Sequence, residues 1–275
     1  GPSNGTSITC LQELPPLRPL LTVRDRARAA AAGFQVGIWG NGMTGAVCTI
    51  GSFVSLNADP TGRYFISNSH CTKTMLGLDG MAAYQEIYPN SSDSIGVEVV
   101  DPAVFTGGSC PSGYVCRWSD AALFKISDAS VWDFGRLALT NANSTTVSGY
   151  TYLQEAGNYG PNPAYMKTGR TTGTTEGYAF SGCINYHPDS ATYQDSSHVT
   201  IPSNLLLLCQ DIYSMAAETG DSGSPVYEPD EYAGLAAPPE NPGAGAPPRR
   251  PDGHEPAHVP IPAQRVDVPP AEAAI

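Results

Sequence analysis

The chain has 275 residues, enough for one large or two small domains, and it carries 14 basic and 26 acidic side chains, for a net charge of -12 at pH 7. A nucleic-acid-binding protein presents a basic face, so this charge argues against that class and we expect no nucleic-acid partner. No run of about 18 apolar residues occurs, so we expect no membrane span.

Residues 1–33 are predicted to form an N-terminal extension. Three prolines, Pro15, Pro16 and Pro19, precede a stretch at residues 23–32 that is rich in Arg and Ala. This composition favours a short helix, which Gly33 would end.

From residue 34 the pattern changes to short segments in which apolar residues alternate with small or polar ones, as in half-buried strands. Turn signals separate them, among them Asn41-Gly42 and residues 59–62. Short strands at this spacing predict an all-β sandwich or barrel. The predicted strands span residues 34–39, 46–56, 63–67, 86–88, 95–100, 121–126, 146–148, 165–168, 177–186, 198–201, 205–212 and 224–227.

The strand pattern stops after Tyr227. Residues 228–275 consist mainly of Pro, Ala, Gly and charged residues, and nearly half of the chain's 25 prolines lie at or after Pro229. Such a sequence cannot pair in a sheet or build a core, so we expect a disordered tail.

Six of the seven cysteines are predicted to form three bridges between neighbouring segments. Because disulfides persist in oxidising compartments, these bridges favour a secreted, extracellular protein. Cys10 is left over, and a free thiol and a bridge to an absent partner both remain open for it. The predicted pairs are Cys48–Cys71, Cys110–Cys116 and Cys183–Cys209.

A candidate nucleophile lies near the end of the strand pattern. Ser222 is surrounded by Gly220, Asp221 and Gly223, just before a β-type run. Glycine lets the backbone turn tightly and approach a substrate, so the serine hydroxyl can project from the turn. If the amides of Gly220 and Ser222 point at one spot, they form an oxyanion hole. The alternative is an ordinary Gly-rich turn before a strand.

A candidate base, His70, follows the predicted strand at residues 63–67. Cys71 is its neighbour, and a bridge to Cys48 would fix this turn on the preceding strand. A general base needs such rigidity, because a misplacement of about 1 Å can cost roughly 100-fold in rate. The alternative is a surface histidine beside a structural disulfide.

A candidate acid, Asp120, begins the apolar run at residues 121–126. A buried carboxylate there needs a partner, because an unpaired buried charge is costly. The Nδ1–H of a histidine serves that purpose and directs Nε2 at the serine. The alternative is an aspartate that caps a turn at the start of a strand.

These motifs, in the order His70, Asp120, Ser222, resemble those of the chymotrypsin-like (trypsin-like) serine proteases. Residues 166–173 and 208–211 resemble the bacterial secreted branch of that family, and the likeness covers residues 34–227. The resemblance implies two antiparallel β-barrels of the chymotrypsin type. The first, at residues 34–145, would carry the histidine and the aspartate, and the second, at residues 146–227, the serine.

The same resemblance implies a serine endopeptidase that hydrolyses peptide bonds through an acyl-enzyme. Ser222 would attack, His70 would move the proton, Asp120 would stabilise the imidazolium, and the amides of Gly220 and Ser222 would bind the oxyanion. The implied partner is a polypeptide substrate; we expect no cofactor and a monomer.

The sequence departs from the family after Ser222, where relatives continue with further strands and a terminal helix. The Pro/Ala-rich tail predicts a second barrel that is incomplete at its C-terminus. The alternative function is therefore an inactive or truncated homologue that acts as a binding module or has no function. Beside the nucleophile, Asp221 is expected to pair with an internal partner rather than with a chain terminus.

Two further motifs match functional patterns by letters alone. His254-Glu255-Pro256-Ala257-His258 fits H-E-x-x-H, but its proline opposes the helix that zinc binding requires, so we expect no metal site. Residues 40–45 fit G-x-G-x-x-G, but a strand follows where a dinucleotide site needs a helix, so a hairpin is favoured.

Overall fold

The computed structural model describes residues 20–40, 45–87, 89, 92–142, 144–153, 164–188 and 201–229. The described residues are nearly all β, with two single-turn 3-10 helices, η1 (Ser69–Cys71) and η2 (Ala129–Val131). The strands are β1 (Gln35–Trp39), β2 (Ala46–Thr49), β3 (Ser52–Leu56), β4 (Asp59–Ser67), β5 (Ala82–Tyr84), β6 (Ser94–Val100), β7 (Val115–Arg117), β8 (Ala122–Ile126), β9 (Arg136–Thr140), β10 (Val147–Tyr152), β11 (Ala164–Gly169), β12 (Gly173–Tyr186), β13 (Leu205–Tyr213) and β14 (Val226–Tyr227).

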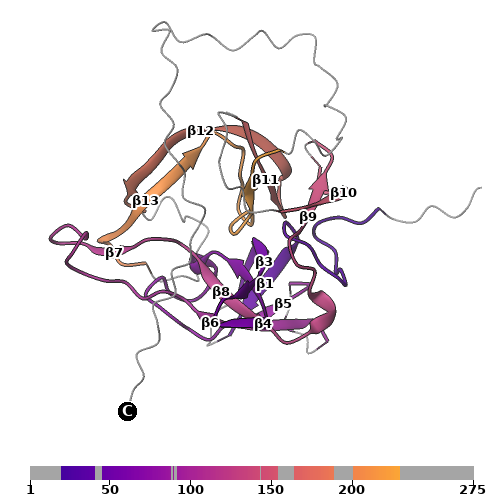
Figure 1. The fold of residues 1–275 in the computed structure, drawn as a ribbon, viewed down its shortest axis with the longest axis horizontal. Coiled ribbons are helices and arrows are strands. Elements are labelled where there is room, and N and C mark those ends of the chain that lie inside the picture. The colour runs from indigo at the N-terminus through magenta and orange to yellow at the C-terminus, as the bar shows by residue number, and fades with distance from the viewer. Residues whose placement is uncertain are drawn as a thin grey trace, which may run out of the picture.

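Three sheets organise these strands. The first has seven strands in the order β2-β1-β5-β6-β8-β4-β3, and the second has five in the order β14-β11-β12-β13-β7. A two-stranded sheet pairs β10 with β9. In Figure 1 the β11–β13 part of the five-stranded sheet lies above the seven-stranded sheet, with β7 at one side and β9 and β10 at the other. The expected all-β class is confirmed.

The main core lies inside the seven-stranded sheet, where alternate side chains of each strand point inward. Phe65 of β4 and Phe124 of β8 are opposite each other in the antiparallel register, and their rings stack at 4.8 Å. Phe34, Ile38 and Ile95 are also fully buried in this cluster. Because Asp120 precedes β8 and His70 follows β4, this packing fixes the two strands from which the candidate base and acid extend.

The prediction of a helix at residues 23–32 is wrong. This segment consists of turns, bends and irregular backbone, with isolated bridges from the adjacent Thr22 to Thr146 and from Ala32 to Leu137. Ala27, Ala30, Ala31 and Ala32 are buried in the cores, and the Ala30 amide donates to the carbonyl of Val131. Small alanines let the backbone fit between the sheets, so tertiary packing overrides the helix propensity of alanine.

Several strand bounds also differ from the predictions. Residues 59–62 are part of strand β4 rather than a turn, and the predicted strand at 46–56 is two strands, β2 and β3. The strand predicted at 86–88 lies instead at Ala82–Tyr84; residue 88 is outside the described residues. Strands β7 and β9 were not predicted, and both pair outside the seven-stranded sheet.

The three predicted cysteine pairs are the pairs that the structure joins. The Cys48–Cys71 bridge links β2 to η1, with its Cα atoms 6.4 Å apart. Cys110–Cys116 closes the loop before β7, and Cys183–Cys209 crosses from β12 to β13.

Some predictions fall outside the described residues: the tail from residue 230, Cys10, the histidines at 254 and 258, the turn at 41–44 and most of the strand at 198–201. Strands β1 and β2 on either side of that turn pair antiparallel, as a hairpin requires. Among the described residues, β14 is the edge of its sheet and pairs with β11. The described part of the chain contains no helix long and apolar enough to cross a membrane.

Candidate active site

The three residues singled out as nucleophile, base and acid meet between the sheets. His70 lies in η1 directly after β4, Asp120 lies before β8, and Ser222 lies in the turn between β13 and β14. His70 Nε2 is 2.6 Å from Ser222 Oγ, and His70 Nδ1 is 2.5 Å from Asp120 Oδ2. Asp120 is 50 positions from His70 in the sequence and Ser222 is 152 positions from it, yet the two residues contact opposite edges of the same imidazole ring.

Asp120 is held at both its carboxylate and its backbone. Its Oδ1 accepts the backbone N–H of His70 at 2.9 Å, and its carbonyl accepts the side-chain amide of Asn68 at 2.5 Å. Burial alone would raise the pKa of Asp120, but the charge of His70, the side-chain and backbone hydrogen bonds from His70, and the charge of Arg117 outweigh burial and leave that pKa below its usual range. An ionised Asp120 only accepts hydrogen bonds, so the Nδ1 of His70 carries the proton and Nε2 faces Ser222 as an acceptor.

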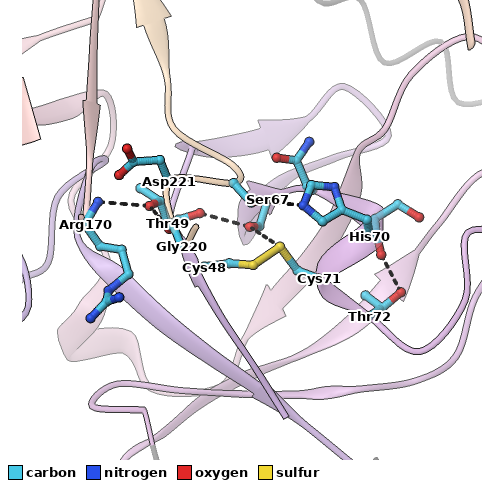
Figure 2. Close-up of a disulfide and its surroundings, with 12 residues drawn as sticks. Cys48, Thr49, Ser67, His70, Cys71, Thr72, Arg170, Gly220 and Asp221 are labelled. Carbon is cyan, nitrogen blue, oxygen red and sulfur yellow. Dashed lines mark hydrogen bonds between the residues drawn. A yellow bond between two sulfur atoms is a disulfide. The ribbon is translucent and has the colours of Figure 1, made fainter. Parts of the chain in front are cut away.

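The turn that carries Ser222 is fastened to the first sheet by Thr49 of β2. The Thr49 amide donates to the Ser222 carbonyl at 2.8 Å, and its buried hydroxyl donates to the Gly220 carbonyl at 2.9 Å. Figure 2 shows the Cys48–Cys71 bridge beside Thr49, with His70 on one side and Gly220 and Asp221 on the other. The disulfide therefore stiffens the segments that hold both the base and the nucleophile.

Gly223 permits this close approach. Its φ is +88°, a conformation that residues with a Cβ rarely adopt, and a Cβ there would collide with the Thr49 carbonyl.

Asp221 has the internal partner that the sequence led us to expect. Its buried carboxylate forms an ion pair with Lys167 of β11, with Nζ and Oδ2 3.0 Å apart. It also accepts the hydroxyl of Thr172 at 2.7 Å and the backbone amides of Thr171, Thr172 and Glu218. Burial raises the pKa of Asp221, but these donors outweigh burial and lower it overall. This network anchors the turn from the side of the five-stranded sheet.

The amides proposed for the oxyanion hole belong to the same turn. Gly220 has φ +97°, and among the described residues the amides of Gly220 and Ser222 donate to no protein acceptor.

The sequence did not reveal several residues of this site. Thr49, Asn68 and Lys167 act through partners that are distant in sequence, up to 171 positions away for Thr49. A short polar side chain beside a cysteine is common in any strand, so Thr49 carried no usable signal. Lys167 lies in the stretch that resembles bacterial proteases, which was the one available hint.

The described residues form an all-β fold, and solved structures of bacterial serine proteases are among those similar to it. No family model matches the chain, and no curated protein matches it. Similar solved structures include Thermobifida fusca protease A, with 18% identity, a TM-score of 0.45, and 72% of this chain and 77% of that chain covered. A chymotrypsin from Cellulomonas bogoriensis has 19% identity and a TM-score of 0.40, with 71% and 75% covered. A Nocardiopsis protease has 16% identity and a TM-score of 0.42, with 70% and 75% covered.

Proposed function

We propose that this protein is a serine endopeptidase that acts through an acyl-enzyme, with Ser222 as nucleophile, His70 as general base and Asp120 as the group that orients the imidazole. The observation that carries the proposal is the continuous chain of contacts from Ser222 Oγ through the ring of His70 to Asp120, at 2.6 and 2.5 Å. A nucleophile, a base and an orienting acid within hydrogen-bond reach are what acyl transfer needs.

In this mechanism Ser222 Oγ forms a bond to the carbonyl carbon of the substrate while its proton passes to His70 Nε2. The carbonyl oxygen becomes an oxyanion and accepts hydrogen bonds from the amides of Gly220 and Ser222. The protonated Nε2 then gives its proton to the leaving amine as the C–N bond breaks. Water, deprotonated by the same nitrogen, attacks the acyl carbon, the ester C–O bond breaks, and His70 Nε2 returns the proton to Ser222 Oγ.

Asp120 supports each of these proton transfers. Its negative charge stabilises the imidazolium, and its hydrogen bond to Nδ1 keeps the ring in the tautomer that accepts from Ser222. The low pKa of Asp120 keeps the carboxylate ionised at neutral pH. Protein residues supply every group in this sequence of steps, and the proposal includes no cofactor. The three disulfides support secretion into an oxidising compartment.

A fluorophosphonate probe, which forms a bond to activated serines, tests the proposal. We expect the folded protein to be labelled at one site and Ser222→Ala to remain unlabelled. His70→Ala should be labelled far more slowly, because the general base typically contributes about 10²- to 10⁴-fold. A quenched peptide library then tests for cleavage inside a chain.

Two outcomes would change the assignment. Absence of labelling in folded protein would contradict the proposal of an active enzyme and favour an inactive homologue that binds polypeptides. Labelling without cleavage of any peptide, but with hydrolysis of simple esters, would keep the serine chemistry and reject the endopeptidase.

A further inference from the structure

Strand β7 belongs to a different sheet from the strands beside it in sequence. It pairs in parallel with β13 of the five-stranded sheet, with Arg117 opposite Leu207. The Cys110–Cys116 bridge and the pairing of Phe105 with Cys116 fix its other side. The chain then passes to the seven-stranded sheet at β8. Residues 115–120 therefore connect the sheet of the candidate acid to the sheet that contains β14.

Arg117 ends this strand with a side chain that is completely buried. Its Nη1 donates to Ser69 Oγ at 2.7 Å and to the carbonyl of Met75 at 3.0 Å. Its Nη2 is 2.5 Å from Asp101 Oδ1 and also donates to the carbonyl of Ala121 at 3.4 Å. Asp101 Oδ2 in turn accepts the Ser69 hydroxyl at 2.7 Å, so Arg117, Asp101 and Ser69 form a closed ring of hydrogen bonds.

Two of the residues that this guanidinium contacts flank the candidate base and acid. Ser69 directly precedes His70, and Ala121 directly follows Asp120. One rigid, planar side chain thus reaches both backbone segments whose spacing sets the contact between His70 and Asp120. Its charge also acts on Asp120, because Arg117 is among the groups that lower the pKa of this carboxyl.

A buried ion pair is costly and is by itself weak support for stability, since apolar replacements are often neutral or stabilising. Here both side chains of the pair are fully inaccessible to solvent. Stability alone therefore does not account for a buried ion pair in this place. The contacts of Arg117 with Ser69 and Ala121 point to a role in positioning the candidate base and acid.

We propose that Arg117 is a positioning residue that sets the geometry of the His70–Asp120 pair and couples it to the five-stranded sheet. The inference rests on the proposed function, because it concerns the base of that reaction. Arg117 touches neither the substrate nor the reacting atoms; it acts through Ser69 and Ala121.

The test replaces the ion pair by neutral side chains of similar size, Arg117→Met with Asp101→Asn. The asparagine still accepts the Ser69 hydroxyl, so no charge is left buried and unpaired. Two readouts are needed: the rate and the affinity of fluorophosphonate labelling, and the proton resonance of His70 Nδ1–H. A proton in a short, charge-assisted hydrogen bond resonates far downfield, so it reports the His70–Asp120 contact directly.

We expect the maximal labelling rate to fall by about 10- to 100-fold with little change in probe affinity, as for a small misplacement of a catalytic group. The Nδ1–H resonance should move upfield. The matched control, Arg28→Met with Asp128→Asn, removes a different ion pair with a separation of 2.9 Å and should keep the wild-type rate and resonance.

A variant with wild-type rate and resonance would overturn the inference, and so would slow labelling with an unchanged resonance. If the double variant does not fold, Arg117→Lys takes its place under the same criteria, because lysine keeps a buried cation but cannot reach both flanks. If the wild type is not labelled at all, the proposed function fails, and the resonance still decides the role of Arg117.

Discussion

Replacing Glu98 by glutamine is expected to increase the free energy of unfolding more at pH 8 than at pH 4. Glu98 lies on β6 with 3% of its surface exposed. Its Oε2 accepts the amides of Asp79 and Met81 at 3.2 and 3.1 Å, whereas Oε1 is buried without a partner among the described residues. Burial is the main reason that the pKa of Glu98 rises from 4.5 to about 7, and the charges of Asp101 and Asp79 add to it.

The sign follows from which state holds the proton more tightly. Between pH 4.5 and about 7 the folded protein binds a proton at Glu98 that the unfolded chain has released, so stability falls as the pH rises. Above pH 7 both states are ionised and the loss is complete. A shift from 4.5 to about 7 corresponds to about 3 kcal/mol at roughly 1.4 kcal/mol per pH unit.

The assay is urea unfolding of Ser222→Ala and of Ser222→Ala with Glu98→Gln, at pH 4 and pH 8. The Ser222→Ala background prevents self-cleavage. Carboxyls distant from Glu98 titrate equally in both proteins, so the difference between the two reports Glu98 together with its coupling to Asp79 and Asp101. The gain from glutamine should be about 3 kcal/mol larger at pH 8 than at pH 4. An equal effect of the substitution at both pH values would refute the reasoning.

Three further substitutions test how the nucleophile turn is held. Lys167→Met should cost about 3 kcal/mol and slow fluorophosphonate labelling, because it leaves Asp221 as a buried unpaired charge; Lys167→Arg should recover both, and equal loss in the two variants would contradict the ion-pair role. Gly223→Ala should cost about 2 kcal/mol in thermal unfolding, since its φ of +88° and the nearby Thr49 carbonyl oppose a side chain; wild-type stability would show that the turn relaxes freely. Thr49→Val should cost about 1–3 kcal/mol by removing the donor to the Gly220 carbonyl, with Thr49→Ser as the control that retains it, and indistinguishable melting curves would count against this contact.

Local patterns predicted most of the β-structure because strand periodicity is written in consecutive residues. Strands such as β4, β8 and β13 alternate or run apolar, and each was placed within a few residues of its observed bounds. The missed strand β7 has three residues and pairs with β13, which is remote in sequence. Strand β9 was also missed, although it pairs with its neighbour β10. The prediction of a helix in the alanine-rich segment at 23–32 was wrong because the conformation of this segment is set by packing against the cores that bury most of its alanines. A local sequence pattern does not encode that packing.

The candidate site could be predicted from the sequence only where the proposed chemistry needs a specific residue type. A reactive serine, a base and an acid have few substitutes, so Ser222, His70 and Asp120 could be proposed from context. Supporting groups are interchangeable: Arg117 could be any surface arginine until its burial against Asp101 is known. Supporting residues such as Arg117 are defined by their packing, so they can be identified only in the folded structure.

The attachment of the Ser222 turn to Thr49 also bears on the order of folding. The two residues of the Thr49–Gly220 hydrogen bond are 171 positions apart, so the turn is completed only after both sheets have docked. Contacts between such distant positions form late, because a long loop must close first. We therefore expect a partly folded chain to lack the contact between Ser222 and His70, so that the proposed hydrolytic activity would arise only once the whole molecule is compact and resists proteolysis.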